Sequence, residues 1–356
     1  MYKLNAKLEK LVPYDPIQGD YRIRLDANES FFDANTVLGE KIARAVAAIP
    51  LNRYPDPYAA GTVAAFAAFY GVNPALVTAG NGSDELISII TSTFLEKGDK
   101  LAVLSADFSM YAFYGAIYEN KPLVFPKNAD LTVDVDKLAA FCTEENVRML
   151  IFSNPCNPTS LGIDRAAIRR LLGGVPAHCL VVLDEAYMDF WTETMLDEME
   201  DYSNLIILKT CSKAVGMAAV RLGFAVAGKS ITRALKAVKS PYNTDAISQT
   251  LGELIFQEQA LLRAKTAELT ASRAQLYAAV RAIAEQTGIF ETVYESVTNF
   301  VFAKTAYADE IFQFLLDNSV AVRKFDGFLR ITAGSQQENA VFIQLLAEAA
   351  ERFSVK

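Results

Sequence analysis

Runs of hydrophobic residues of strand length recur up to about residue 240, with stretches of helical spacing between several of them. The strand-length runs are 101–105, 147–152, 180–183, 205–208 and 222–227. Apolar residues recur three and four apart at 83–95 and 165–172, which indicates helices. Continuous apolar strands that alternate with helices predict an α/β fold, a mostly parallel sheet covered by helices on both faces.

The pattern changes after Pro241. Residues 246–287 are rich in alanine and poor in glycine, and their apolar spacing predicts one long helix or two. Short strand-like runs and a final helix follow, at 300–303, at 328–332 and from Glu338 onward. We therefore expect three parts, an N-terminal arm (1–28), a large α/β domain (29–240) and a smaller α+β C-terminal domain (241–356).

Composition limits the chemistry that is open to the chain. Its 356 residues are 52% hydrophobic and 21% charged, which suits a folded protein of about two domains. The formal net charge of −8 argues against nucleic acid or an acidic membrane surface as a partner. The chain has one histidine, His178, so multi-histidine metal sites are excluded and we expect no metal. Lysine, acids, tyrosine, arginine or a cofactor must carry the chemistry.

The four cysteines, Cys142, Cys156, Cys179 and Cys211, are widely spaced and form no Cys-x-x-Cys pair. This spacing suits neither a disulfide framework nor a zinc site, and reduced thiols in a cytoplasmic protein are the simplest interpretation. The N-terminal stretch carries charges throughout, so we expect no signal peptide. No apolar run reaches the roughly 18 residues of a membrane span, so no membrane association is expected.

Polar clusters follow the predicted strands, where open α/β sheets bind their ligands. They are GNGSDE (80–85), SNPCNPT (153–159), DEAY (184–187) and LKTCSK (208–213), with Arg221 eight residues after Lys213. Each cluster alone has an ordinary structural interpretation: a helix cap, a rigid turn, solvated acids or a surface lysine.

Together the clusters offer four complementary kinds of group. They are an anion site (Ser83, Asp84, Thr210, Ser212 and Arg221), a carboxylate (Asp184), an amide with a phenol (Asn157 and Tyr187) and a lysine (Lys213). These groups match a phosphate, a protonated ring nitrogen, a phenolate oxygen and an aldehyde. Pyridoxal 5'-phosphate presents all four, and an acid partner keeps its ring an electron sink, so we predict this cofactor.

Seven motifs in order along the chain resemble those of the fold-type-I pyridoxal-phosphate aminotransferases, and most nearly those of the histidinol-phosphate aminotransferase family. They are LDANE (25–29), RYPD (53–56), GNGSDE, NPCNPT (154–159), DEAY, CSKAVGMAAVRLGF (211–224) and LRIT (329–332). The resemblance spans about residues 4 to 335. It implies the fold-type-I large domain with a smaller C-terminal domain, and a cytoplasmic homodimer with shared active sites.

The resemblance also implies a role for each candidate residue. Lys213 would form the Schiff base and then move the substrate's Cα proton, and Asp184 would pair with the ring nitrogen. The other cofactor contacts would be Asn157 and Tyr187 at the ring oxygen, Phe108 stacked on the ring, Ser83, Asp84, Thr210, Ser212 and Arg221 at the phosphate, and Tyr54 at the phosphate of the neighbouring subunit. The substrate's anionic group would meet Arg330, with Arg323 and Tyr14 as further candidates.

The implied reaction is transamination between histidinol phosphate and 2-oxoglutarate, in histidine biosynthesis, with a small-molecule amino donor and a 2-oxo acid as partners. One departure concerns the stacking aromatic: the family usually has Pro-Thr before it, and this chain has Ala106-Asp107, which adds negative charge near the ring face. Three alternatives stay open. They are an aminotransferase for aromatic or other amino acids, a threonine-phosphate decarboxylase-like enzyme on the same scaffold, and a binding protein without activity.

Overall fold

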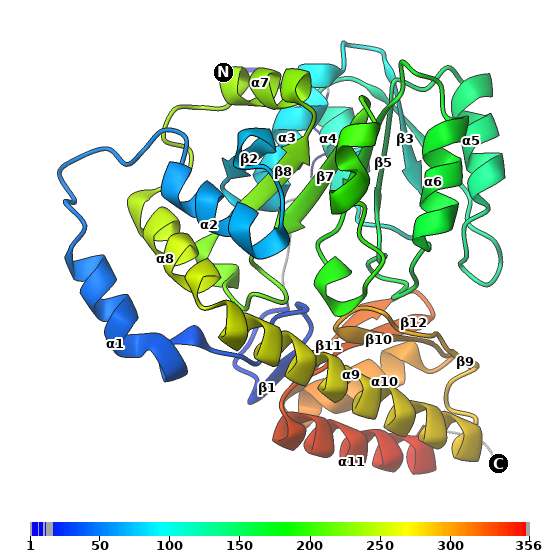
Figure 1. Ribbon diagram of the computed structural model, residues 1–356. Helices are drawn as coiled ribbons and strands as arrows, with labels where there is room; N and C mark the ends of the chain where they lie inside the picture. The colour runs from blue at the N-terminus through cyan, green and yellow to red at the C-terminus, as the bar shows by residue number, and fades with distance from the viewer. Residues whose placement is uncertain (1, 6, 10, 12–16, 354–356) are drawn as a thin grey trace.

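The computed structural model describes residues 2–5, 7–9, 11 and 17–353, and these form two β-sheets with helices packed on each (Figure 1). The larger sheet has seven strands in the order β2-β8-β7-β6-β5-β3-β4. The smaller sheet has five, in the order β1-β11-β12-β10-β9. Tyr14 lies outside the described residues.

The larger sheet is mostly parallel, as predicted. Its strands are β2 (Val77–Gly80), β3 (Lys100–Leu104), β4 (Lys121–Phe125), β5 (Met149–Ser153), β6 (Leu180–Asp184), β7 (Leu205–Thr210) and β8 (Gly223–Ala227). Strands β4, β3, β5, β6 and β7 are parallel to one another, and β8 runs antiparallel between β7 and β2. The five strand-length apolar runs of the sequence are β3 and β5 to β8.

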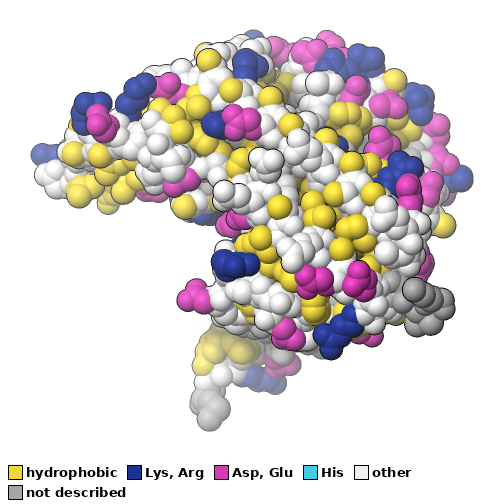
Figure 2. Space-filling view, turned by 90° about the horizontal axis from the view of Figure 1, so that it is seen from below, with side chains coloured by type: hydrophobic (Ala, Val, Ile, Leu, Met, Phe, Trp, Pro, Cys, Tyr) yellow, Lys and Arg dark blue, Asp and Glu magenta, His cyan; other side chains and the backbone are white. Residues whose placement is uncertain are grey.

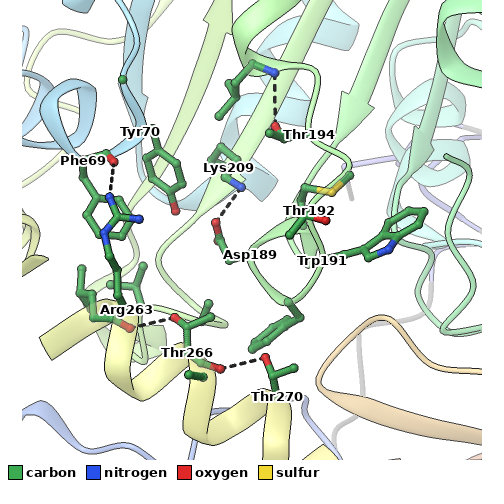
Figure 3. Close-up of a pocket in the computed structure, with 18 of the residues that line it drawn as sticks. Phe69, Tyr70, Asp189, Trp191, Thr192, Thr194, Lys209, Arg263, Thr266 and Thr270 are labelled. Carbon is green, nitrogen blue, oxygen red and sulfur yellow. Dashed lines mark hydrogen bonds and ion pairs between the residues drawn. The ribbon is translucent and has the colours of Figure 1, made fainter. Parts of the chain in front are cut away.

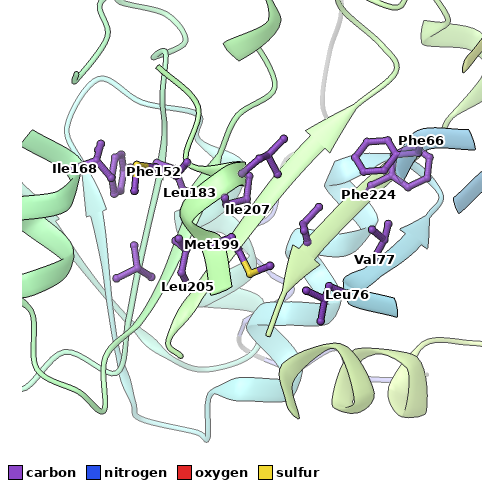
Figure 4. Close-up of a cluster of buried hydrophobic side chains, with 14 of the residues drawn as sticks. Phe66, Leu76, Val77, Phe152, Ile168, Leu183, Met199, Leu205, Ile207 and Phe224 are labelled. Atoms are coloured by element: carbon purple, nitrogen blue, oxygen red, sulfur yellow. The ribbon is translucent and has the colours of Figure 1, made fainter. Parts of the chain in front are cut away.

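Helices cover both faces of this sheet (Figure 1). One face packs against α3 (Gly82–Phe94), α4 (Met110–Ile117) and α7 (Lys229–Val238), and the other against α2 (Ala60–Tyr70), α5 (Val135–Glu144), α6 (Arg165–Gly174) and α8 (Ala246–Gln257). Strand side chains alternate between faces, so the neighbours Ile206 and Ile207 belong to different cores. Figure 4 shows the second core, in which Ile207 lies with Phe152, Leu183 and Phe224.

The smaller sheet has its own core with three helices. Its strands are β1 (Ile23–Leu25), β9 (Thr292–Val293), β10 (Phe300–Lys304), β11 (Val320–Phe325) and β12 (Phe328–Thr332), and its helices are α9 (Gln259–Thr287), α10 (Ala308–Asp317) and α11 (Gln336–Phe353). The predicted helical stretch 246–287 is two helices, α8 and α9, and Glu258 lies between them.

Two elements connect the parts that the sequence divides at residues 28 and 240. Strand β1 lies within the predicted arm and pairs in parallel with β11 of the smaller sheet. Helix α8 follows residue 240, yet its Ile255 and Phe256 belong to a core of the larger sheet. The domain limits themselves stay a prediction.

The remaining helices are short or lie at the edge of the molecule. Helix α1 (Ala34–Ala47) projects from the body and contacts α8 (Figure 1). Four 3₁₀ turns complete the described elements, η1 (Pro74–Leu76), η2 (Met188–Phe190), η3 (Leu196–Asp201) and η4 (Ala218–Val220). Among the described residues, no helix combines the length and the apolar character needed to span a bilayer.

Candidate active site

The carboxyl ends of three parallel strands bring the predicted polar clusters together. Ser153 ends β5, Asp184 ends β6 and Thr210 ends β7. Asp184 is in register with Ser153 on one side and with Leu208 on the other. The loops that carry the other candidates therefore leave the sheet at one edge, as the parallel topology requires.

Asp184 is a buried carboxylate that pairs with no basic side chain of the described chain. Its Oδ2 accepts a hydrogen bond from the Tyr111 hydroxyl at 2.8 Å, and its Oδ1 accepts one from the Ala186 amide at 3.1 Å. Burial raises the pKa of Asp184 to about 6, and these two hydrogen bonds oppose part of that rise. A ligand that brings a positive charge or a protonated nitrogen would relieve this carboxylate.

The beginning of α3 is shaped to receive an anion. No side chain caps its first turn, so the amides of Ser83 and Asp84 have no capping partner there. Gly82 has φ +82°, and a Cβ on it would lie 2.7 Å from Arg221 Nη2. A Cβ on Gly223 of β8 would lie 2.3 Å from Ser83 N. Only glycines allow the guanidinium and the helix start to approach each other this closely, and together they form a site for a phosphate.

The two hydroxyls predicted for the same anion lie beside Arg221. Arg221 Nη1 donates to Ser212 Oγ at 3.5 Å and to the Ala218 carbonyl at 3.2 Å. Ser212 also contacts Thr210, because its backbone N–H donates to Thr210 Oγ1 at 3.2 Å. The structure thus gathers the predicted anion-binding residues in one place.

Lys213 extends its amine toward the same edge of the sheet. Its Nζ donates to the Ala27 carbonyl at 2.9 Å and lies 5.9 Å from the centre of the Tyr187 ring. Burial is the main cause that lowers the pKa of Lys213 to about 8, and the positive charge of Arg330 adds to it. A substantial fraction of this amine is therefore neutral near physiological pH and able to act as a base or nucleophile.

Tyr187 and Asn28 connect the larger sheet to the N-terminal segment. The Tyr187 hydroxyl accepts a hydrogen bond from Asn28 Nδ2 at 2.8 Å, and burial raises the pKa of Tyr187 to about 12. The backbone N–H of Asn28 in turn donates to Thr332 Oγ1 of β12 at 3.0 Å. Asn28 lies in the LDANE motif, but the sequence analysis gave it no role. Its place in that motif was the available signal.

Arg330 enters the site from the smaller sheet. It is 8% exposed, its Nη1 donates to Asn157 Oδ1 and its Nη2 donates to the Asp26 carbonyl at 2.6 Å. The Phe300 ring lies 5.4 Å beneath the guanidinium carbon. The structure therefore unites Asn157 and Arg330, two candidates 173 residues apart, through a direct hydrogen bond.

The remaining candidates are less closely gathered. Phe108 is partly buried and packs edge-to-face on Tyr111, with ring centres 5.4 Å apart. Tyr54 is 80% exposed and stacks on Tyr242 at 4.5 Å. Arg323 lies on β11 directly across the ladder from Arg330. Tyr14 falls outside the described residues.

Tyr111 is a site residue that sequence reasoning passed over. Its side chain is 1% exposed, and burial raises the pKa of Tyr111 well above its ordinary value. It lies in the first turn of α4, three residues after Phe108, and the two rings pack edge-to-face. That spacing was the signal that could have identified it.

A separate cavity of about 1090 Å³ lies between these strand ends and α9, on the opposite face of the sheet (Figure 3). Lys209 points into it because β7 alternates its side chains, and Thr210 faces the other way. Lys209 Nζ is 3.0 Å from Asp189 Oδ1 and 3.9 Å from Glu185 Oε2. Within this cavity the charges meet partners in the chain itself, so we assign the chemistry to the other face.

Comparison with known proteins identifies the family of the chain. The family model described as aminotransferase class I and II matches residues 22–346. The histidinol-phosphate aminotransferase of Clostridium novyi (strain NT) is 38% identical over 339 residues, which cover 94% of this chain and 93% of that protein. The histidinol-phosphate aminotransferase of Thermoanaerobacter pseudethanolicus is 34% identical over 334 residues, 92% and 93% of the two chains. The predicted aminotransferase family is confirmed.

Solved structures agree on the fold. The histidinol-phosphate aminotransferase from Sinorhizobium meliloti, in complex with pyridoxal-5'-phosphate, superposes with a TM-score of 0.88 at 22% identity and covers 99% of this chain and 98% of its own. L-threonine-O-3-phosphate decarboxylase from Porphyromonas gingivalis superposes with a TM-score of 0.78 at 21% identity, covering 92% and 99%. The predicted fold-type-I architecture is therefore confirmed.

Proposed function

We propose that this chain, which belongs to the aminotransferase class I and II family, transfers an amino group between histidinol phosphate and 2-oxoglutarate with pyridoxal 5'-phosphate as cofactor, as a step of histidine biosynthesis. The observation that carries the proposal is the convergence of the Lys213 amine and the buried Arg330 guanidinium from two different sheets. The relatives named above as histidinol-phosphate aminotransferases, which align over almost all of the chain, support the choice of substrate.

The residues at the sheet edge fit the cofactor. Asp184 is a buried acid in need of a positive partner, and the first turn of α3 with Arg221 offers donors to a phosphate. When bound, the cofactor supplies an electron sink for negative charge on the substrate's α-carbon. The residues that would hold it are Asp184 at the ring nitrogen, Tyr187 and Asn157 at the ring oxygen, Phe108 at the ring face, and Ser83, Asp84, Thr210, Ser212 and Arg221 at the phosphate.

Lys213 would move the proton. Its Nζ takes the proton that leaves the substrate's α-carbon and later returns one during the second half of the exchange. A pKa of about 8 suits this task, because a base with a pKa near the working pH both accepts and gives up a proton readily.

Arg330 would bind the phosphate of histidinol phosphate. A guanidinium carries more N–H donors than the two that Arg330 gives to Asn157 and Asp26, and its planar fork suits a phosphate, which accepts paired hydrogen bonds. Arg323 lies across the β11–β12 ladder and would add positive charge at this end of the site. An aminotransferase for plain amino acids would use the same arginine for a carboxylate.

A homodimer is the assembly that we propose. Exposed hydrophobic side chains recur on one segment, where Leu51 is 82%, Tyr54 80% and Tyr58 56% exposed, and the stacked Tyr242 extends them. Hydrophobic groups also appear among charged ones on the projecting part of the molecule in the space-filling view (Figure 2). A second copy would bury these groups and carry Tyr54 to the partner's cofactor phosphate.

The cytoplasm is the compartment that we propose for this dimer. The four cysteines are free and buried, which suits a reducing environment.

The test is an absorbance titration of the cofactor-loaded protein with histidinol phosphate, with glutamate, phenylalanine and threonine phosphate in parallel. Loss of the yellow absorbance at low concentrations of histidinol phosphate supports the proposal. Conversion by phenylalanine alone would point to a general aminotransferase, and carbon dioxide released from threonine phosphate would point to a decarboxylase. A protein that never becomes yellow would overturn the cofactor assignment.

A matched pair of arginine variants tests the phosphate site. Arg330→Gln should raise the KM for histidinol phosphate about 10- to 100-fold, since hydrogen bonds to a charged group contribute about 1.5–3 kcal/mol. Arg281→Gln removes a surface arginine of α9 that pairs with Glu285, and it should leave the KM unchanged. Equal KM values for both variants would contradict the role of Arg330.

A further inference from the structure

Asp107 joins two strand-end loops at the candidate active site. It follows β3 and directly precedes Phe108, and its Oδ1 accepts from the Phe108 amide at 2.7 Å. The same oxygen accepts from the Ser153 hydroxyl, and Oδ2 accepts from the Ser153 amide at 3.2 Å. One carboxylate therefore receives three donors, which fix the ends of two adjacent parallel strands relative to each other.

Ser153 extends this connection to the substrate side of the site. A serine hydroxyl has a single proton, and here that proton is directed at Asp107. The Ser153 oxygen is therefore left to accept, and it accepts from the Asn157 amide at 3.1 Å. Asn157 Oδ1 in turn accepts from Arg330 Nη1. Hydrogen bonds thus connect Asp107 through Ser153 to the backbone of Asn157, and the side chain of Asn157 meets Arg330.

The charge of Asp107 is held in place by its surroundings. Lys127, whose Nζ donates to the Ala106 carbonyl at 2.9 Å, is the nearby cation that favours the ionised form. Burial raises the pKa of Asp107, while Lys127 and the three donors oppose the rise. The negative charge also acts on Asp184, where it adds to the raised pKa of that carboxyl. The ionised form of Asp107 can accept all three hydrogen bonds without offering a proton of its own.

We propose that Asp107 is a positioning residue of this active site, whose carboxylate fixes Phe108 and the Ser153 hydroxyl and, through Ser153, orients Asn157 and Arg330 for the substrate's anionic group. The inference rests on the proposed function for the identity of cofactor and substrate. Asp107 accepts hydrogen bonds from Phe108 and Ser153. By accepting the Ser153 hydroxyl proton, Asp107 leaves the Ser153 oxygen free to accept from the backbone N–H of Asn157.

Two variants separate the parts of this connection. Asp107→Asn removes the charge and sets an amide group against the Ser153 amide, and Ser153→Ala removes the hydroxyl while leaving the charge. In the loaded enzyme each should raise the KM for histidinol phosphate about tenfold and change kcat less, because the orientation of Arg330 is affected and Lys213 is not. The double variant should have a KM no higher than that of the more impaired single variant, since both changes break the same series of hydrogen bonds.

A second measurement does not depend on catalysis. Titration of the cofactor-free protein with pyridoxal phosphate should give a dissociation constant about tenfold higher for both variants, since Phe108 and Asn157 lose their fixed positions. In Asp107→Asn the pH at which the yellow absorbance changes should also fall, because a negative charge near the site favours proton binding. Asp134→Asn is the matched control, an acid that accepts from the Lys137 amide at the start of α5.

Thermal unfolding distinguishes positioning from plain stability. A merely structural Asp107 would behave like Asp134, with a lower melting temperature and unchanged KM, cofactor affinity and absorbance pH, and this result would overturn the inference. If Asp107→Asn does not fold, Ser153→Ala decides the matter by the same measurements. If histidinol phosphate is not the substrate, the cofactor titration still tests Asp107, so the two proposals fail separately.

Discussion

The two faces of one sheet edge hold buried charges in opposite states. Asp184 and Glu185 are neighbours in the chain but face opposite sides of the sheet, because side chains alternate along a strand. Glu185 shares Lys209 with Asp189 on the cavity side. Asp184, on the other side, pairs with no basic side chain of the described chain, and the nearby Lys213 amine donates only to a carbonyl.

The presence or absence of ion-pair partners distinguishes the structural face of the sheet from the candidate active site. Buried ions that pair within the chain hold elements together, and removing one partner leaves a costly charge behind. Buried ionisable groups that lack an ion-pair partner within the described chain and whose pKa values move toward neutrality, as those of Asp184 and Lys213 do, indicate a place where a ligand supplies the missing partners. Matched substitutions on the two faces should therefore give opposite results.

The largest contrast is expected from the two lysines. Lys213→Met should reduce transamination about 10⁴-fold or more, because it removes the base that moves the substrate's proton. Lys209→Met should change activity per folded molecule by less than about tenfold, because its amine faces the other side of the sheet. Initial rates measured at saturating cofactor check both values. Comparable activity losses would remove the functional difference between the faces.

Stability should show the reverse order. Lys209→Met leaves Glu185 and Asp189 without their shared cation, and it should lower the free energy of unfolding by about 3–5 kcal/mol. Lys213→Met removes an amine that is already disfavoured in its charged form, and should not destabilise the cofactor-free protein at pH 7. Urea unfolding of both cofactor-free variants is the measurement. A loss below about 1 kcal/mol for Lys209→Met would show that its ion pairs contribute little.

Asp184 predicts a dependence of stability on pH. Its pKa rises from 3.8 to about 6 on folding, so the folded protein binds this proton more tightly than the unfolded chain does. The favourable contribution is complete below pH 3.8 and is lost as the pH rises through about 6, a loss of about 3 kcal/mol at about 1.4 kcal/mol per unit. In cofactor-free protein, Asp184→Asn should therefore gain stability relative to wild type between pH 4 and 6. A constant difference across this range would contradict the raised pKa.

The smallest effect is expected from Tyr111→Phe. The Tyr111 hydroxyl donates to Asp184 and favours its ionised form, so its loss should move the stability transition of Asp184 about one pH unit higher. Tyr118→Phe is the control, because it removes a phenol at the end of α4 that bonds to Ser88 of α3 and not to Asp184. Unfolding measured across the same pH range compares them. Equal transitions in both variants would mean that the Tyr111 bond does not stabilise the carboxylate.

Much of the larger sheet could be predicted because its signal is local. Strands buried on both faces are continuous apolar runs, and the runs at 147–152 and 205–208 correspond to β5 and β7. Strands β1 and β9 have three and two residues, too few for any periodic pattern. Their existence depends on partners far along the chain, as β1 depends on β11.

The sequence by itself determined the family, the order of the strand-end motifs and the identity of Lys213 and Asp184 as candidates, because residue type and spacing express these directly. Only the tertiary structure decided which groups meet. It joined Tyr111 to Asp184 and Arg330 to Asn157, and it directed Asp107 at Ser153. Burial and hydrogen bonding between distant segments set proton affinity and orientation, and neither property can be read from a residue's neighbours in the chain.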